Sequence, residues 1–312
     1  MRRRILTIDG GGIKGVFPAS FLANIEKQIK GPVSNYFDLV VGTSTGGILA
    51  LGLGLGFSGN ELLQFYKNYG ERIFAGNKSP FKKLFAFFYS KFNQTELRNA
   101  LEETFGDKKL GDSKTRLVIP SLNLTTGEVY IHKTAHHERF TVDYKNRAVD
   151  VALSTSAAPT YFPAHLLPSG SPLIDGGVWA NNPIGIAVAE AIGILKWPAD
   201  SLEILSLGCT SSPIQKRKLS AGKGYWALRV SDLFLRAQAS GSQGIAAVLT
   251  SHQQICRIEE VVAPGRFELD SHESISDLEG LGESSARKNL VSIKKFFDVP
   301  ADHFEPYYKL KL

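Results

Sequence analysis

Short runs of apolar residues alternate along this chain with longer stretches in which apolar positions recur every three or four residues. The short runs predict buried strands, and the longer stretches predict helices with one face toward a core. Predicted strands cover 5–8, 39–41, 116–123, 128–132 and 202–207. Predicted helices cover 16–30, 45–55, 58–69, 95–105, 183–195, 225–250 and 283–297. Strands that alternate with helices indicate an α/β protein with a central, mainly parallel sheet covered on both faces.

The pattern continues through all 312 residues without an internal repeat, a long low-complexity linker or a clear break in composition. A hydrophobic content of 43% supplies enough apolar side chains for a buried core. We therefore predict a single domain over residues 1–312. Its recognisable motifs fall within about 5–208, and residues 210–312 are expected to form a C-terminal helical part of the same domain.

The charge balance is basic, with a formal net charge of +6 spread along the chain rather than gathered in one tail. Such an excess favours anionic surfaces, whether membrane or nucleic acid, without choosing between them. The two cysteines, Cys209 and Cys256, show no CxxC spacing, which argues against a disulfide framework or a zinc site. A reducing compartment fits this usage best, so the expected location is the cytoplasm.

No stretch of the sequence is expected to span a membrane. The basic start at 1–4 is similar to the beginning of a signal peptide, but Asp9 and three glycines interrupt any apolar segment after it. The most apolar later stretch, 48–57, has roughly half the length that a bilayer requires. Any contact with a membrane is therefore expected to be peripheral.

The run Gly42-Thr43-Ser44-Thr45-Gly46 stands between a predicted strand and a predicted helix. A serine between two glycines in this setting is typical of a nucleophile elbow, a tight turn that exposes the hydroxyl. In such turns the N–H of the following residue, here Thr45, faces the oxyanion of the reaction, and the helix start favours negative charge. Taken alone, the motif is also compatible with a glycine-rich turn that has no catalytic role.

A glycine loop follows the first predicted strand, with Gly10, Gly11, Gly12 and Gly15 after Asp9. The spacing Gly-x-Gly-x-x-Gly is the fingerprint of dinucleotide binding, which also requires an acidic residue about 20 positions on, at the end of the second strand. Asp38 has roughly that spacing but precedes its strand. The N–H groups of Gly10, Gly11 and Gly12 suit another anion, the oxyanion formed when a serine attacks an ester.

A third motif reads Asp175-Gly176-Gly177, followed by 181–183 (Asn-Asn-Pro). An aspartate on a glycine turn at a strand end can approach a serine closely, although a structural turn is the ordinary alternative. None of the seven histidines follows the elbow in a triad motif, and only His165 lies near one of the motifs.

Four stretches, in this order, make the chain resemble the patatin-like phospholipases, or lipid acyl hydrolases. They are 8–15, 42–47, 155–163 and 175–177 with 181–183. The resemblance implies a three-layer α/β/α fold and a Ser–Asp dyad in which Ser44 is the nucleophile and Asp175 the general base. It also implies that the glycine loop serves as the oxyanion hole and that neither a metal nor a cofactor is required.

The activity that the resemblance implies is hydrolysis of fatty-acyl esters of membrane phospholipids through an acyl-enzyme. A lipid acyltransferase that uses the same acyl-enzyme is an alternative within this class. Two alternatives belong to other classes, namely a catalytically silent lipid-binding module and a dinucleotide-binding oxidoreductase. Some compact bacterial members of the family are phage-defence effectors that a cyclic nucleotide activates, and residues 210–312 leave room for such a site. No DNA or RNA partner is expected, and the sequence predicts no particular oligomer.

Two weaker signals concern surfaces. Aromatic residues recur at helical spacing over 80–93 beside Lys82, Lys83 and Lys91, which fits either an interfacial helix or an ordinary core-facing helix. A basic run at 216–218 fits a solvated loop or a contact with phosphate headgroups.

Overall fold

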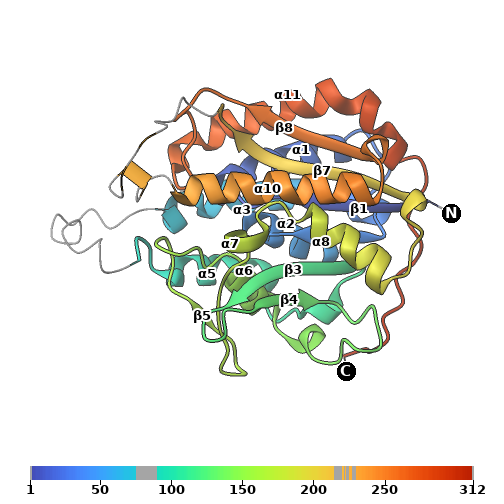
Figure 1. The fold of residues 1–312 in the computed structure, drawn as a ribbon, viewed down its shortest axis with the longest axis horizontal. Coiled ribbons are helices and arrows are strands. Elements are labelled where there is room, and N and C mark those ends of the chain that lie inside the picture. The colour runs from blue at the N-terminus through green and yellow to red at the C-terminus, as the bar shows by residue number, and fades with distance from the viewer. Residues whose placement is uncertain are drawn as a thin grey trace.

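A central sheet forms the middle layer of the protein, and helices cover both of its faces (Figure 1). The computed structural model describes residues 2–74, 90–213 and 230–310, together with positions 220, 222, 225 and 226. The aromatic segment predicted over 80–93 lies outside the described residues as far as 89, and the basic run at 216–218 lies outside them entirely.

Within the described residues, eight strands pair in the order β5-β6-β3-β2-β1-β7-β8, with β4 beside β3. The four pairs β1–β2, β1–β7, β2–β3 and β7–β8 are parallel, whereas β4, β5 and β6 join in antiparallel pairs. The strands are β1 (Arg3–Ile8), β2 (Leu39–Gly42), β3 (Arg116–Asn123), β4 (Val129–Lys133), β5 (His165–Leu166), β6 (Pro172–Asp175), β7 (Leu202–Ser211) and β8 (Ile255–Val261).

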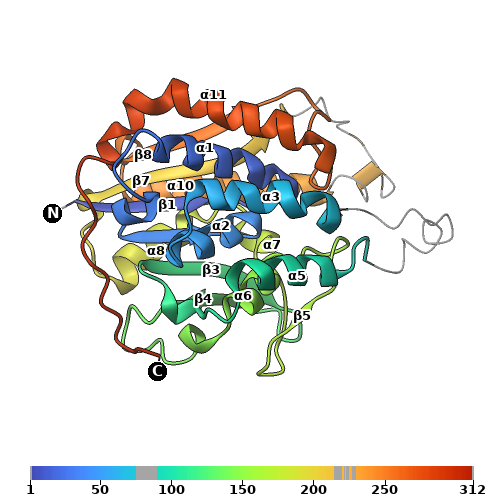
Figure 2. The ribbon, with the colours of Figure 1, turned by 180° about the vertical axis from the view of Figure 1, so that it is seen from behind.

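The helices divide between the two faces of the sheet. One face carries α1 (Val16–Glu26), α2 (Thr45–Gly54), α3 (Gly59–Phe74), α5 (Gln94–Phe105), α6 (Ala148–Thr155) and α11 (Ile275–Ile293), which lie in front in Figure 2. The other face carries α7 (Gly177–Ala180), α8 (Ile184–Ala189) and α10 (Val230–Leu249), which lie in front in Figure 1. The predicted three-layer α/β/α arrangement is therefore confirmed.

Each face of the sheet has its own hydrophobic core. The larger core packs α1, α2 and their neighbours against Leu6, Ile8 and Val40, and the smaller one packs α8 and α10 against Ile5 and Val41. These side chains alternate between the two faces because successive residues of a strand point to opposite sides. A strand buried on both faces needs mostly apolar residues, which explains Ile5, Leu6 and Ile8 of β1 and the apolar run 39–41 of β2.

The sequence pattern located most of these elements but missed several. The predicted strand and helix of 202–207 and 225–250 correspond to β7 and α10, and the predicted hairpin corresponds to β3 and β4. The C-terminal part is not purely helical as expected, because β8 extends the sheet there and α11 begins at Ile275 instead of 283. β8 is not recognisable as a strand from the sequence pattern, because the charged residues Arg257, Glu259 and Glu260 interrupt its apolar residues.

Helices α1 and α11 are in close contact, and Gly282 allows this contact. A Cβ atom at Gly282 would lie 2.5 Å from the carbonyl oxygen of Phe17 and 2.8 Å from Cβ of Ser20. On the same helix, Gly280 is exposed, and a Cβ atom there would meet nothing within 4 Å.

We predict that Gly282→Ala lowers the free energy of unfolding by about 1–3 kcal/mol, because the extra methyl group forces the two helices apart. The matched control Gly280→Ala should leave stability unchanged or raise it by up to about 1 kcal/mol, since alanine favours the helix and meets no neighbour. Urea unfolding of both variants measures the difference, and equal effects of the two substitutions would contradict the packing described.

Candidate active site

The turn after β2 holds Ser44 in a backbone conformation that residues other than glycine rarely adopt, with φ of 55° and ψ of −124°. Ser44 is also the cap residue at the start of α2, so its side chain stands at the positive end of that helix. The flanking glycines are required by space. A Cβ atom at Gly42 would lie 2.1 Å from the carbonyl oxygen of Gly46, and one at Gly46 would lie 2.2 Å from that of Ile8.

The Ser44 hydroxyl donates a hydrogen bond to Asp175 Oδ2 at 2.6 Å. The two residues meet because β2 and β6 share one edge of β3. β4 pairs with β3 from Val118 to Leu122 and so occupies the other edge. β2 and the antiparallel β6 therefore run toward each other along the edge of β3 that β4 does not occupy. Ser44 lies two residues after the end of β2, and Asp175 is the last residue of β6.

Asp175 is buried, with 4% of its surface exposed. Burial raises the pKa of its carboxyl group to about 6, although the hydrogen bonds from Ser44 and from the Gly177 N–H oppose the rise. The Gly177 N–H donates to Oδ1 at 2.6 Å, so one carboxylate oxygen is held by the turn while the other faces the serine. Gly176 is required at this turn, because a Cβ atom there would lie 2.2 Å from the carbonyl oxygen of Pro120.

Thr155, the last residue of α6, fixes the elbow from the side. Its hydroxyl accepts a hydrogen bond from the Ser44 N–H at 3.0 Å and donates one to the Pro120 carbonyl at 2.6 Å. The Thr43 hydroxyl adds a second link, since it donates to the Ala180 carbonyl at 2.7 Å. Thr155 belongs to one of the sequence motifs, but the sequence predicted no role for it. The motif does not reveal which backbone groups the Thr155 hydroxyl contacts.

The glycine loop departs from the prediction at one position. The Gly10 N–H donates to the Asn181 carbonyl at 3.0 Å and is therefore not free to face an oxyanion in this conformation. Gly10 is required for close approach, since a Cβ atom there would lie 2.5 Å from Asn181 Oδ1 and 3.1 Å from Cβ of Ser44. The predicted donor role of Gly10 is corrected accordingly: its N–H ties the glycine loop to the loop that follows Asp175.

Within the described residues, the N–H groups of Gly11, Gly12 and Thr45 have no hydrogen-bond acceptor. The Thr45 N–H belongs to the first turn of α2, where backbone donors have no partner within the helix. Gly12 has φ of 58°, and a Cβ atom there would lie 2.2 Å from the Leu269 carbonyl oxygen. Gly15 leaves space for Thr45, whose Oγ1 a Cβ atom would approach to 2.1 Å.

Other candidate residues lie away from the serine. Asp38 is buried at the start of β2, where it accepts hydrogen bonds from the Arg4 N–H and from the Arg3 side chain, both at 2.9 Å. Because β1 and β2 are parallel, this is the end of the sheet opposite the glycine loop. His165 is engaged by Asp150 through Nε2 at 3.1 Å. Asp38 therefore does not complete a dinucleotide site at the glycine loop. His165 pairs with Asp150 and not with Ser44.

No set of three or more His, Cys, Asp or Glu side chains is arranged to hold a metal ion within the part of the chain that the structure describes. Over the same described ranges, no helix combines the length and apolarity needed to cross a bilayer.

A serine elbow, a buried aspartate and a glycine loop on a three-layer α/β/α fold define the class of patatin-type hydrolases. The model of the patatin-like phospholipase family matches residues 6–188. The chain belongs to the patatin-like phospholipase family. It is accordingly a hydrolase, and the dinucleotide-binding oxidoreductase considered from the glycine spacing is excluded.

Three relatives match between 76% and 97% of this chain. A cGAMP-activated phospholipase of Vibrio cholerae is 33% identical over 344 aligned positions, which cover 97% of this chain and 96% of the relative. A cGAMP-activated phospholipase of Pseudomonas aeruginosa is 35% identical over 240 residues, or 76% of this chain and 72% of the relative. Patatin-like protein 2 of Oryza sativa is 30% identical over 359 positions, covering 96% and 86%.

Proposed function

We propose that this protein hydrolyses fatty-acyl esters of membrane phospholipids, with Ser44 as the nucleophile and Asp175 as the general base. The observation that carries the proposal is the 2.6 Å hydrogen bond from the Ser44 hydroxyl to Asp175 Oδ2, in a chain of a phospholipase family. A base within hydrogen-bond reach of the nucleophile is the first geometric requirement of such catalysis.

In the first half of the reaction, the Ser44 oxygen bonds to the ester carbonyl carbon as its proton passes to Asp175. The carbonyl oxygen becomes an oxyanion that accepts hydrogen bonds from the N–H groups of Gly11, Gly12 and Thr45, at the positive end of α2. When the oxyanion collapses, the bond to the leaving alcohol breaks and Asp175 returns the proton to that alcohol. The acyl group remains on Ser44.

In the second half, water replaces the alcohol. The water oxygen bonds to the acyl carbon as Asp175 takes a proton from the water, and the second oxyanion occupies the same site. Collapse then breaks the bond to Ser44, the serine oxygen recovers the proton from Asp175, and a free fatty acid leaves. A pKa of about 6 suits Asp175 for both steps, since a carboxylate at this value is a stronger base than an exposed aspartate but is still ionised at neutral pH.

We further propose that a cyclic dinucleotide activates the enzyme, as the names of the Vibrio and Pseudomonas relatives state for those proteins. Identity to the Vibrio relative extends over 97% of this chain and so includes residues beyond the catalytic motifs. Such an enzyme would degrade the membrane of its own cell in antiviral defence.

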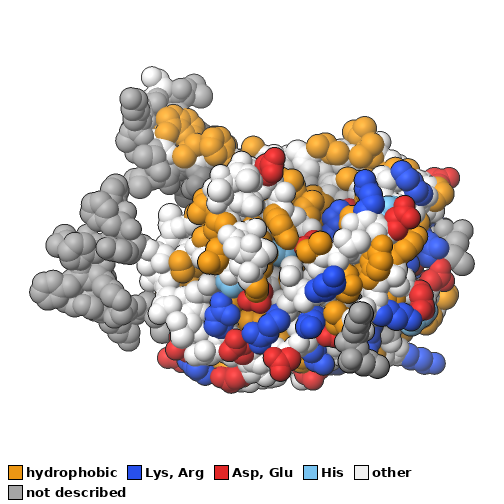
Figure 3. Space-filling view, turned by 90° about the horizontal axis from the view of Figure 1, so that it is seen from below, with side chains coloured by type: hydrophobic (Ala, Val, Ile, Leu, Met, Phe, Trp, Pro, Cys, Tyr) orange, Lys and Arg blue, Asp and Glu red, His pale blue; other side chains and the backbone are white. Residues whose placement is uncertain are grey.

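The place of action that we propose is the cytoplasm, with peripheral contact to the membrane. Cys209 and Cys256 are free thiols, which suits a reducing compartment. The face seen in Figure 3 carries Lys and Arg side chains among hydrophobic ones, with Asp and Glu side chains beside them. The net charge of +6 favours contact with an anionic surface.

We predict that Ser44→Ala and Asp175→Asn each reduce fatty-acid release by at least ~10³-fold, because each removes one member of a unit that acts together. Release from phospholipid vesicles and from a 4-nitrophenyl acyl ester measures the effect. The exposed residues Ser169 and Asp107 provide matched controls, and Ser169→Ala and Asp107→Asn should retain full activity. Undiminished turnover in either dyad variant would falsify the assignment.

The pH dependence follows from the raised pKa of Asp175, which must be ionised to accept the serine proton. We predict that kcat/KM rises about tenfold per pH unit up to a midpoint near 6 and is level above it. The profile is measured on the soluble ester from pH 4.5 to 8, with thermal unfolding at each pH as the control for folding. A rate that is constant between pH 5 and 8 would contradict the proposed base.

Activation is tested by adding cyclic dinucleotides to the wild-type protein and measuring fatty-acid release from vesicles. We predict that cGAMP raises the rate by roughly 5–150-fold, the range typical of coupling between two sites. The linear dinucleotide serves as the ligand control, and Ser44→Ala with cGAMP as the enzyme control. The same basal rate with and without every cyclic dinucleotide tested would refute activation while leaving the hydrolase proposal intact.

A further inference from the structure

Asp9, the residue directly before the glycine loop, carries a carboxylate that is almost fully enclosed, with 4% of the residue exposed. Its backbone N–H donates to the Leu207 carbonyl at 2.9 Å, which places the start of the loop beside β7. A buried carboxylate must be paired, because removing an isolated charge from water is costly. The partner that it has comes from a distant part of the chain.

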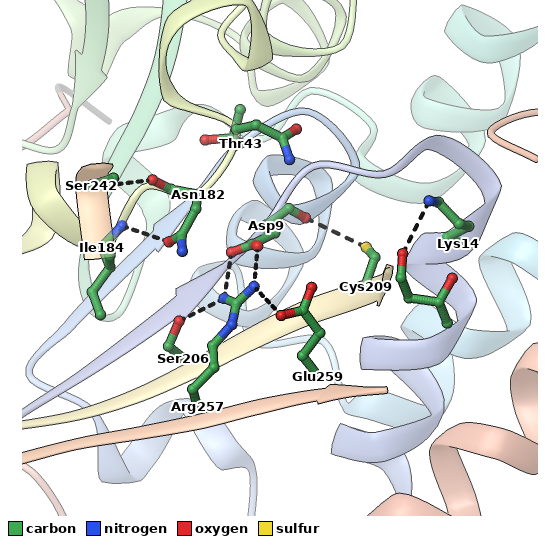
Figure 4. Close-up of polar contacts among 12 residues, drawn as sticks. Asp9, Lys14, Thr43, Asn182, Ile184, Ser206, Cys209, Ser242, Arg257 and Glu259 are labelled. Atoms are coloured by element: carbon green, nitrogen blue, oxygen red, sulfur yellow. Dashed lines mark hydrogen bonds and ion pairs between the residues drawn. The ribbon is translucent and has the colours of Figure 1, made fainter. Parts of the chain in front are cut away.

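That partner is Arg257 on β8, whose guanidinium binds the Asp9 carboxylate with both terminal nitrogens (Figure 4). Nη1 donates to Oδ1 at 2.9 Å and Nη2 donates to Oδ2 at 2.5 Å. Paired donors on two carboxylate oxygens fix the orientation of both planar groups as well as their separation. Nη1 also donates to the Ser206 hydroxyl at 2.8 Å, and Glu259 lies 3.5 Å from Nη2.

The sheet is shaped to let Arg257 reach across β7. Arg257 stands opposite Ser206 in the register of β7 and β8, and Ser206 stands opposite Thr7 of β1. Gly208 leaves the space that the guanidinium occupies, since a Cβ atom there would lie 2.5 Å from Nη2. The register of the two strands shifts between Leu207 and Thr210, next to this position.

The glycine loop then lies directly on the end of β7. A Cβ atom at Gly11 would lie 2.5 Å from Sγ of Cys209, and the Cys209 thiol donates to the Asp9 carbonyl at 3.8 Å. Only two residues separate Asp9 from Gly12, so the contacts that anchor Asp9 restrain the backbone that carries the N–H groups of Gly11 and Gly12.

We propose that Arg257 is a positioning residue for catalysis, which holds the oxyanion-binding N–H groups of the glycine loop in place through Asp9. The inference rests on the proposed function, in which these N–H groups bind the oxyanion. Arg257 lies outside residues 6–188, the part of the chain that the family model matches. The motif-bearing region therefore depends on the C-terminal part for its oxyanion site.

The test compares Arg257→Met, which removes the ion pair, with Arg257→Lys, which keeps the charge but not the paired donors. A misplaced oxyanion site slows the chemical step and leaves substrate binding intact, so we expect kcat to fall about 100-fold in Arg257→Met with KM changed less than about 3-fold. Arg257→Lys should lose roughly 10-fold. The control Arg287→Met removes an exposed arginine paired with Glu283 on α11 and should match the wild type.

Each rate is divided by the concentration of active sites, obtained from the endpoint of fluorophosphonate labelling, so that a loss of folded protein does not count as a loss of kcat. The midpoint of the pH profile should stay at the wild-type value, because Asp175 is untouched. A kcat per site within 3-fold of the wild type in Arg257→Lys and in folded Arg257→Met overturns the inference. If Arg257→Met does not fold, Arg257→Lys decides alone.

Failure of this inference and failure of the proposed function give different results. A wild-type protein without esterase activity, or an active Ser44→Ala, refutes the hydrolase proposal. An active wild type, an inactive Ser44→Ala and fully active Arg257 variants refute only the role of Arg257.

Discussion

The hydrogen bond between Ser44 and Asp175 depends on one constraint of the sheet, which is that a strand has only two edges. β4 fills one edge of β3, so β2 and β6 must share the other and end facing each other. The serine and the aspartate are 131 residues apart in sequence, yet each needs only a short glycine turn to reach its partner. The pairing of β2 and β6 with β3 thus fixes the position of Ser44 relative to Asp175.

In the mechanism that we propose, burial allows Asp175 to serve as the base where many serine hydrolases use a histidine. An exposed aspartate titrates near 3.9 and is a poor base at neutral pH. Enclosure raises the pKa of Asp175 to about 6, and the remaining gap to the serine is offset by stabilisation of the oxyanion, which the reaction generates in the same step. The proposed dyad would therefore depend on the glycine loop more strongly than a triad does, because its base contributes less of the driving force.

The apolar pattern predicted the layers of the fold, and the resemblance of the motifs to the patatin-like phospholipases implied that Asp175 meets Ser44. Apolar runs and glycine turns at 42–46 and 175–177 are readable along the chain. The role of Gly10 was not predictable from the sequence, because the three glycines are equivalent in the motif. Only the structure shows that the Gly10 N–H donates to the Asn181 carbonyl. Arg257 was missed for the same reason: a charged residue in a strand signals exposure, and only its register shows that it reaches Asp9.

The two halves of the catalytic site are held by different parts of the chain. Ser44 and Asp175 are positioned by β2, β3, β6, Thr155 and the Gly177 N–H, all before residue 178. The glycine loop is held at its start by Arg257 on β8, and the helix α1 that follows it packs closely against α11 through Gly282. We therefore expect a displacement of β8 to act first on the glycine loop, through the contact between Arg257 and Asp9. In the mechanism that we propose, chemistry requires both halves, so a change in the C-terminal part would alter the rate without direct contact to Ser44 or Asp175.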